Sequence, residues 1–190
     1  MSEQLSDSLG FLELSRVSTG IAVVDAAAKK APVSILLTRP VSGPKYLLLF
    51  RGDVASTEES FRAAHEVAGN ALLDSCFLPN ASKQLWPLLG DTHYADSWPG
   101  SIEDSVAIFE TKSATAAIRS ADIAVKEAPV LLRDFQLCQG FSGRGLFSFT
   151  GDLSDVQAAA AAATHAAQGG FEHVEIIAAP SADIHGRLFR

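Results

Sequence analysis

The residues from Glu13 to Val33 read ELSRVSTGIAVVDAAAKKAPV, and those from Glu110 to Val130 read ETKSATAAIRSADIAVKEAPV. The two stretches align without a gap at an offset of 97 residues. Their identical positions are Glu13/Glu110, Ile21/Ile118, Asp25/Asp122, Ala27/Ala124, Lys29/Lys126, Ala31/Ala128, Pro32/Pro129 and Val33/Val130. The match resumes at an offset of 99 at Gly52-Asp53 and Gly151-Asp152, and it ends near an offset of 101 at Pro79 and Pro180. Such a repeat indicates a duplicated domain.

Each copy predicts the same order of elements. In copy one we expect strands over 9–14, 33–38, 46–50 and 71–78, with an Ala-rich helix over 19–30 and a second helix that starts at Ser56-Thr57, where a hydroxyl can cap the free amides. In copy two we expect strands over 106–111, 130–134, 146–149 and 173–178, with helices over 115–127 and 154–163. The order β-α-β-β-α-β is the ferredoxin-like arrangement, so the sequence predicts an α+β fold of two tandem domains.

We place the first domain, with its linker, at residues 1–97 and the second at 98–190. The segment that joins the two copies, residues 84–100, contains Trp86, Trp98 and several prolines, which indicate a packed rather than a flexible connection. The segment His185 to Arg190 carries an apolar Leu-Phe pair. It packs on its own chain or docks onto a neighbour or a cargo protein.

Charge excludes some partners. The chain has 15 Lys and Arg against 22 Asp and Glu, a net charge of −7, which argues against binding to nucleic-acid phosphates. Charged residues make up 19% of the chain, below the usual quarter or so, so we expect part of the surface to be covered. The polar start, Met1 to Ser8, lacks the features of a secretory signal, and no apolar run reaches the ~20 residues that cross a bilayer. We therefore expect a cytoplasmic protein that does not enter membranes.

No set of residues predicts catalysis. The five histidines show no HExxH spacing, and Cys76 and Cys138 form no CxxC pair. Glu13 and Glu110 recur in the first strand of each copy, and a role as structural hydrogen-bond acceptors explains them with fewer assumptions than catalysis. We expect no enzyme activity, no metal site and no cofactor.

The ordered set of short motifs resembles one known family. Leu9 to Glu13, Asp25 to Lys29 and Leu49 to Val54, with their counterparts Phe109 to Thr111, Ser120 to Lys126 and Thr150 to Leu153, resemble the bacterial microcompartment shell domain. The resemblance spans about residues 9–79 and 105–180. It is closest to the tandem-domain, trimer-forming shell proteins of the single-layer, unpermuted kind.

The resemblance implies a structural function. Such proteins form homotrimers whose six domains imitate a hexagon, and these pseudohexameric tiles join other hexameric and pentameric shell proteins around a set of metabolic enzymes in the cytoplasm. The family's tile-edge lysine falls on Lys29 and Lys126. The family's edge arginine has no match at residues 79–83 or 180–183.

The resemblance also implies a central pore for small metabolites, lined by the loop between the second and third strands. The corresponding residues are Pro40, Val41, Ser42, Gly43 and Pro44 in copy one, and Gln139, Gly140, Phe141, Ser142 and Gly143 in copy two. Lys45 and Arg144 follow these loops and could attract anions to the mouth. Some relatives hold an iron–sulfur cluster through a loop cysteine. Here that position is Ser42, a poor cluster ligand, so we expect no cluster.

Two other functions stay open. A ferredoxin-like duplicated chain could be a trimeric ligand-sensing regulatory protein that binds ligands at glycine-rich loops between subunits. A trimeric enzyme with its site in a subunit cleft is less favoured, because no acid, base and nucleophile converge. Assembly separates the shell protein from the sensor, because a shell tile joins larger sheets or particles whereas a sensor stops at the trimer.

Overall fold

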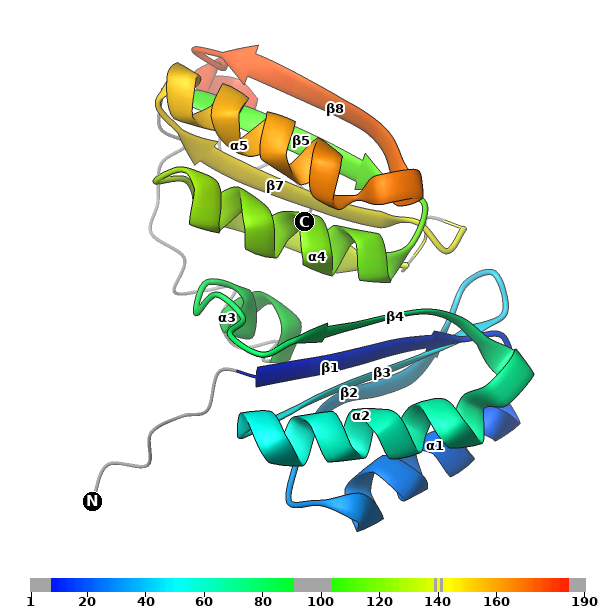
Figure 1. Ribbon diagram of the computed structural model, residues 1–190. Helices are drawn as coiled ribbons and strands as arrows, with labels where there is room; N and C mark the ends of the chain where they lie inside the picture. The colour runs from blue at the N-terminus through cyan, green and yellow to red at the C-terminus, as the bar shows by residue number, and fades with distance from the viewer. Residues whose placement is uncertain (1–7, 91–103, 139, 141, 185–190) are drawn as a thin grey trace. The chain divides into compact units, whose positions relative to one another are not determined.

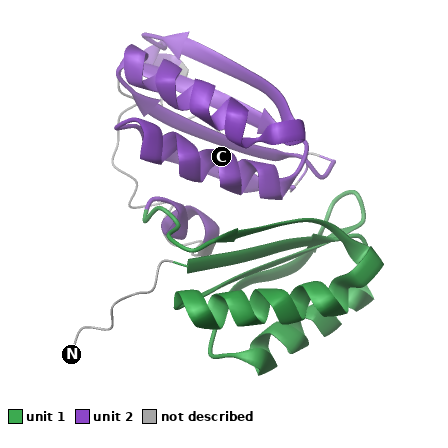
Figure 2. Cartoon of the chain, in the orientation of Figure 1, with its two compact units in different colours: residues 1–83 green, residues 84–190 purple. Residues whose placement is uncertain are grey.

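The computed structural model describes residues 8–90, 104–138, 140 and 142–184. It divides the chain into two compact units, residues 1–83 and 84–190 (Figure 2). Residues 84–90, which we grouped with the first domain, lie in the second unit because the Gln84 side chain bonds to the backbone of Val130 and Leu132. The boundary at 97/98 stays a prediction, since residues 91–103 are outside the described part.

The first unit is a four-stranded antiparallel sheet with two helices on one face (Figure 1). Its strand order is β2-β3-β1-β4, which is the ferredoxin-like order that the sequence predicts. The elements are β1 (Ser8–Leu14), α1 (Val17–Lys30), β2 (Ser34–Val41), β3 (Lys45–Gly52), α2 (Val54–Ala68) and β4 (Leu72–Leu78).

The second unit repeats this architecture, with strand order β6-β7-β5-β8. The α+β fold of two tandem domains is thus confirmed. No helix in the described part of the chain is long and apolar enough to cross a bilayer. The elements are α3 (Leu85–Gly90), β5 (Ser105–Thr111), α4 (Ala114–Glu127), β6 (Leu131–Leu137), β7 (Gly145–Gly151), α5 (Leu153–Ala166) and β8 (Phe171–Ala178).

Helix α2 starts earlier than the sequence indicated. Asp53, not Ser56, is the N-cap: its Oδ1 accepts a hydrogen bond from the Ser56 backbone N–H at 2.8 Å, and its Oδ2 accepts one from the Ser56 hydroxyl at 2.6 Å. These two bonds hold the pKa of the Asp53 carboxyl below its usual value. The expected cap at Ser56 is therefore wrong, because an extended Asp just before the helix reaches the free amides first.

Each core lies between its sheet and its helices. In the first unit Leu12, Leu48 and Phe50 are buried in one cluster with residues of both helices. In the second unit Phe109 and Phe147 stack with ring centroids 4.9 Å apart, and both are fully buried. Burial of these large apolar side chains is the main favourable term in the folding of each unit.

The first helix of each copy approaches its sheet closely at a glycine. The glycine is on the helix in copy one and on the strand in copy two. A Cβ on Gly20 of α1 would lie 2.3 Å from the Tyr46 ring of β3. In copy two the equivalent helix residue is Ala117 and the strand residue is Gly145, whose added Cβ would lie 2.6 Å from the Ala117 Cβ. Each copy therefore keeps one glycine at this contact, because close-packed interiors leave no room for two side chains there.

We predict that Gly145→Ala destabilises the second unit. The new methyl would lie 2.8 Å from the Ser113 carbonyl oxygen as well as against Ala117, and backbone cannot move aside as a flexible side chain can. Overpacking of this kind costs about 1–3 kcal/mol of unfolding free energy.

Chemical denaturation followed by circular dichroism measures the loss. Gly169→Ala is the control, because nothing lies within 4 Å of a Cβ at Gly169. Equal stability of the two variants would contradict the prediction.

Candidate functional site

The turn between β2 and β3 is the first of two loops expected to line a pore. The β2–β3 ladder extends to the pair Val41 and Lys45, so the turn consists of residues 42–44, all exposed. Pro40 and Val41, expected in the loop, are the last residues of β2. Proline fits there because β2 is an edge strand, where a missing N–H breaks no inner ladder. Gly43 has φ +84°, which glycine adopts without strain.

The turn between β6 and β7 is longer. Strand β6 ends at Leu137, and Cys138 follows it with φ +63°. The Cys138 backbone N–H donates to the Arg144 carbonyl at 3.0 Å, and its thiol donates to the Gly143 carbonyl at 3.2 Å. A buried cysteine therefore closes the base of this turn from inside.

The second set of expected pore residues is only partly described. Gly140 and Ser142 are exposed and Gly143 is buried, while Gln139 and Phe141 lie outside the described residues. Ser142 has φ +50°, an uncommon conformation for a residue other than glycine. The two turns of one chain therefore differ in length and backbone geometry.

The basic residues that follow the turns are paired with glutamates. Lys45 Nζ lies 2.9 Å from Glu13 Oε2, and Glu13 is fully buried. Arg144 Nη2 lies 3.0 Å from Glu172 Oε1, and its Nη1 lies 3.7 Å from Glu110 Oε2. About half of the Arg144 side chain is exposed. These contacts weaken the expected attraction of anions, because each cation faces a carboxylate of its own unit. They agree with the structural role expected for Glu13 and Glu110.

We predict unequal costs for removing these two glutamates. Glu13→Ala leaves the Lys45 ammonium, whose side chain is 17% exposed, without its carboxylate, and breaking a buried pair in this way costs about 3 kcal/mol or more. Glu110→Ala removes an ion pair between two half-exposed side chains, which is worth about 1 kcal/mol at most.

The two variants serve as matched controls, since the residues are equivalent in the repeat. Denaturant titration of each variant gives the free energies of unfolding. A loss as large for Glu110→Ala as for Glu13→Ala would show that burial does not set the cost.

The expected tile-edge lysines occupy equivalent places in the last turns of α1 and α4. Lys29 Nζ lies 2.7 Å from Asp25 Oδ2, and Lys126 Nζ lies 2.5 Å from Asp122 Oδ2. Each pair spans one helical turn, with the acid on the N-terminal side, the favourable orientation. The structure places both side chains at the surface, 75% and 41% exposed.

An acidic residue on the edge strand β6 was not identified from the sequence. Asp134 is partly buried and accepts a hydrogen bond from the Ser148 hydroxyl at 3.0 Å. Burial raises the pKa of the Asp134 carboxyl above its usual value, and it lowers the pKa of the neighbouring Arg133. The signal in the sequence is that copy one has Leu37 at the position of Asp134.

We predict that Asp134→Asn raises stability near neutral pH. A carboxyl whose pKa is higher in the folded state destabilises that state once it is ionised, and this penalty disappears as pH falls below the pKa of the unfolded chain, about 3.9. The amide is neutral and still accepts the Ser148 hydrogen bond.

The measurement is the difference in melting temperature between Asp134→Asn and the wild type at pH 7 and pH 4. The difference should shrink at the lower pH, and exposed Asp183 replaced by Asn is the control. A stability loss at pH 7 would contradict the prediction.

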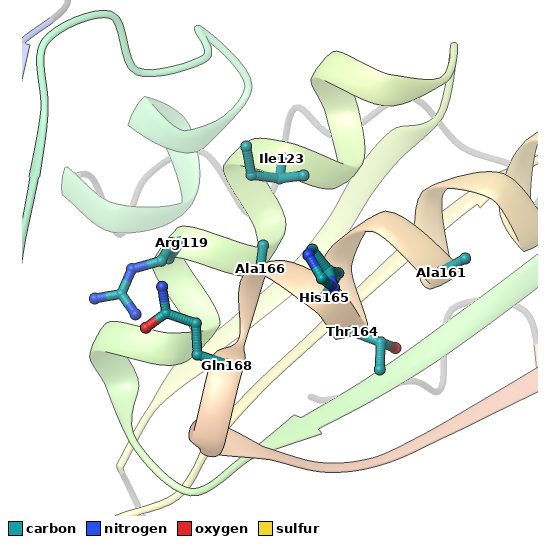
Figure 3. Close-up of a pocket in the computed structure, with 7 residues that line it drawn as sticks. All are labelled: Arg119, Ile123, Ala161, Thr164, His165, Ala166 and Gln168. Atoms are coloured by element: carbon teal, nitrogen blue, oxygen red, sulfur yellow. The ribbon is translucent and has the colours of Figure 1, made fainter.

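A shallow hollow of about 740 Å³ lies on the helices of the second unit (Figure 3). Among its lining residues only Arg119 and His165 are ionisable, and no carboxylate or thiol lines it. The lining therefore offers no carboxylate to orient His165 as a general base. The lining residues are Arg119, Ile123, Ala161, Thr164, His165, Ala166 and Gln168.

Within the described ranges, no three or more His, Cys, Asp or Glu side chains gather as metal ligands. Both cysteines are buried and unbridged. Ser42, the position of the cluster cysteine in some relatives, is exposed in its turn. The expected absence of an iron–sulfur cluster stays a prediction.

Comparison with known proteins gives a consistent result. The BMC domain matches the chain twice, at residues 8–81 and 105–180. The bacterial microcompartment shell protein PduT of Citrobacter freundii is 32% identical over 163 residues, which cover 86% of each chain.

Solved structures agree. A microcompartment protein from Desulfitobacterium hafniense aligns with a TM-score of 0.81 and 29% identity, over 93% of this chain and 97% of that one. A fused permuted hexameric shell protein from the RMM microcompartment aligns with a TM-score of 0.63 over 84% and 82% of the two chains; at 23% identity it supports the fold alone. The two matched segments coincide with the two repeats.

Proposed function

Because the chain belongs to the BMC domain family and is a tandem-domain bacterial microcompartment shell protein, we propose that three copies form a pseudohexameric tile of a shell facet. One observation carries the proposal: each chain holds two complete copies of the same fold. A ring of six similar domains closes with three such chains, and cyclic closure of this kind leaves no unused interface within the ring.

Two features support edge-to-edge packing of tiles. Lys29 and Lys126 lie at the same place in both copies, and each carries its charge at the end of a long apolar stem that can lie flat in a contact. The low charge content of the chain, 19%, suits surfaces covered by neighbours. We propose that these lysines contact the adjoining tile.

We further propose that the turns between β2 and β3 and between β6 and β7 surround the axis of the ring and form a pore for small metabolites. Residues 42–44, Gly140 and Ser142 are exposed, and their backbone amides and hydroxyls can replace part of the hydration of a passing solute. The tile would lie in the shell of a cytoplasmic microcompartment beside other hexameric and pentameric shell proteins. We propose no catalytic role for it.

The test is assembly. The purified protein should have a mass of about 60 kDa in solution by light scattering, three times the 20.0 kDa chain. Coexpressed with other shell proteins, it should be incorporated into sheets or closed particles seen by electron microscopy. A trimer that is never incorporated would favour the ligand-sensing alternative, and a monomer would overturn both.

The edge lysines supply a matched comparison in the same experiment. The double variant Lys29→Ala/Lys126→Ala should still be a trimer but should be incorporated less, because it loses the contact between tiles and keeps those within the ring. Lys112→Ala, an exposed lysine outside the helices, is the control. If the double variant is incorporated as well as the control, the two lysines do not contribute to the contact between tiles.

A further inference from the structure

Equivalent residues on α1 and α4 differ sharply in exposure. Ile21 of α1 is 59% exposed, whereas its repeat counterpart Ile118 of α4 is 0% exposed. One turn earlier, Val17 is 41% exposed and Ala114 is fully buried. Residues four apart lie on one face of a helix, so a whole apolar stripe is covered on α4 and uncovered on α1.

The stripe continues to the aspartate of the ion pair. The Asp25 side chain is 59% exposed and that of Asp122 is 2% exposed. Val17, Ile21 and Asp25 together are here called the α1 stripe. Ile and Asp are identical in the two copies, so at these two positions the difference in exposure lies in what covers the helix.

The segment that precedes the second repeat lies on that repeat. Helix α3 packs against both α4 and β6. Gln84, just before α3, donates from Nε2 to the Val130 carbonyl at 3.0 Å and accepts from the Leu132 N–H at 2.9 Å. Leu85 is fully buried. The elements in extensive contact with α1 are α2 and strands β1, β2 and β3 of its own sheet.

The repeat shows which segment is the counterpart of α3. In sequence, α3 follows the fourth strand of copy one and packs on the first helix of copy two. The offset of 101 residues that relates Pro79 to Pro180 places residues 186–190 at the positions of Leu85 to Leu89. That stretch contains the apolar pair Leu188-Phe189 and lies outside the described residues.

We propose that residues 185–190 of one protomer dock on the α1 stripe of a second copy of this chain. The proposal rests on the proposed trimer: in a ring, the domain that follows copy two is copy one of the next protomer, just as copy two follows copy one within the chain. Three such contacts, added to the three that α3 makes, cover the first helix of all six domains in the same way. A cyclic, head-to-tail contact repeats identically around the ring.

A disulfide tests the docking and its partner. In the double variant Ile21→Cys/Phe189→Cys, oxidised glutathione should join neighbouring chains, so that a denaturing gel without reductant shows dimers and trimers that reductant removes. The single variants are controls, because native Cys76 and Cys138 are buried. If the two new thiols are oxidised but the gel shows only monomer, the disulfide lies within one chain. Residues 185–190, here called the tail, would then lie on their own chain, which would overturn the proposal.

The remaining outcomes separate this proposal from the trimer itself. No disulfide in a variant that light scattering shows to be a trimer overturns the docking and leaves the proposed tile intact. A wild-type monomer overturns both.

Thiol labelling gives a second measurement that needs no new bond. A cysteine at Ile21 should react at least about tenfold faster with a maleimide when the tail carries Leu188→Asp/Phe189→Asp than when the tail is native. Val67→Cys, an exposed position on α2 of the same unit (43% exposed), should react at the same rate with either tail. Equal rates at position 21 would overturn the proposal.

Discussion

The close contact between the first helix and the third strand of each copy is the constraint on which the rest of each unit depends. In copy one Gly20 lies against the Tyr46 ring, and in copy two Ala117 lies against Gly145. Because protein interiors are close-packed, a larger residue on the helix at this contact requires a smaller residue on the strand, and the reverse. Tyr46 and Gly145 come at the start of β3 and β7, directly after the candidate pore turns. The contact that holds the helix on the sheet therefore also holds one end of each turn.

The ionic contacts beside the turns have diverged more than the fold. Lys45 reaches a fully buried Glu13, whereas Arg144 contacts two partly exposed glutamates. A turn of residues 42–44 in copy one is matched by a longer turn, closed by the buried Cys138 thiol, in copy two. A ring of three chains would therefore alternate two kinds of turn around its axis. The chemical groups there would have threefold rather than sixfold symmetry.

Most of the fold could be predicted from the sequence because duplication doubles every signal. The Ala-rich helices, the proline after each first helix and the Gly-Asp turns recur in order, and the order alone yields the ferredoxin-like topology. The wrong prediction of the α2 cap and the missed acidic residue both depend on atomic positions that sequence patterns do not give. Asp53 displaced Ser56 as the cap because the chain before α2 is extended, and Asp134 went unnoticed because its burial depends on how β6 packs in the unit.

By itself the sequence determined the duplication, the α+β fold, the family, and the equivalence of Lys29 with Lys126 and of Glu13 with Glu110. Those conclusions follow from the order and identity of residues, which need no coordinates. Tertiary structure alone decided which equivalent residues are buried: Glu13 but not Glu110, and Ile118 but not Ile21. The physical reason is that the burial of a residue depends on the element that packs on it as well as on the residue itself. Identical residues in the two copies have different energies when different elements pack on them, as α3 does on α4 in the second unit.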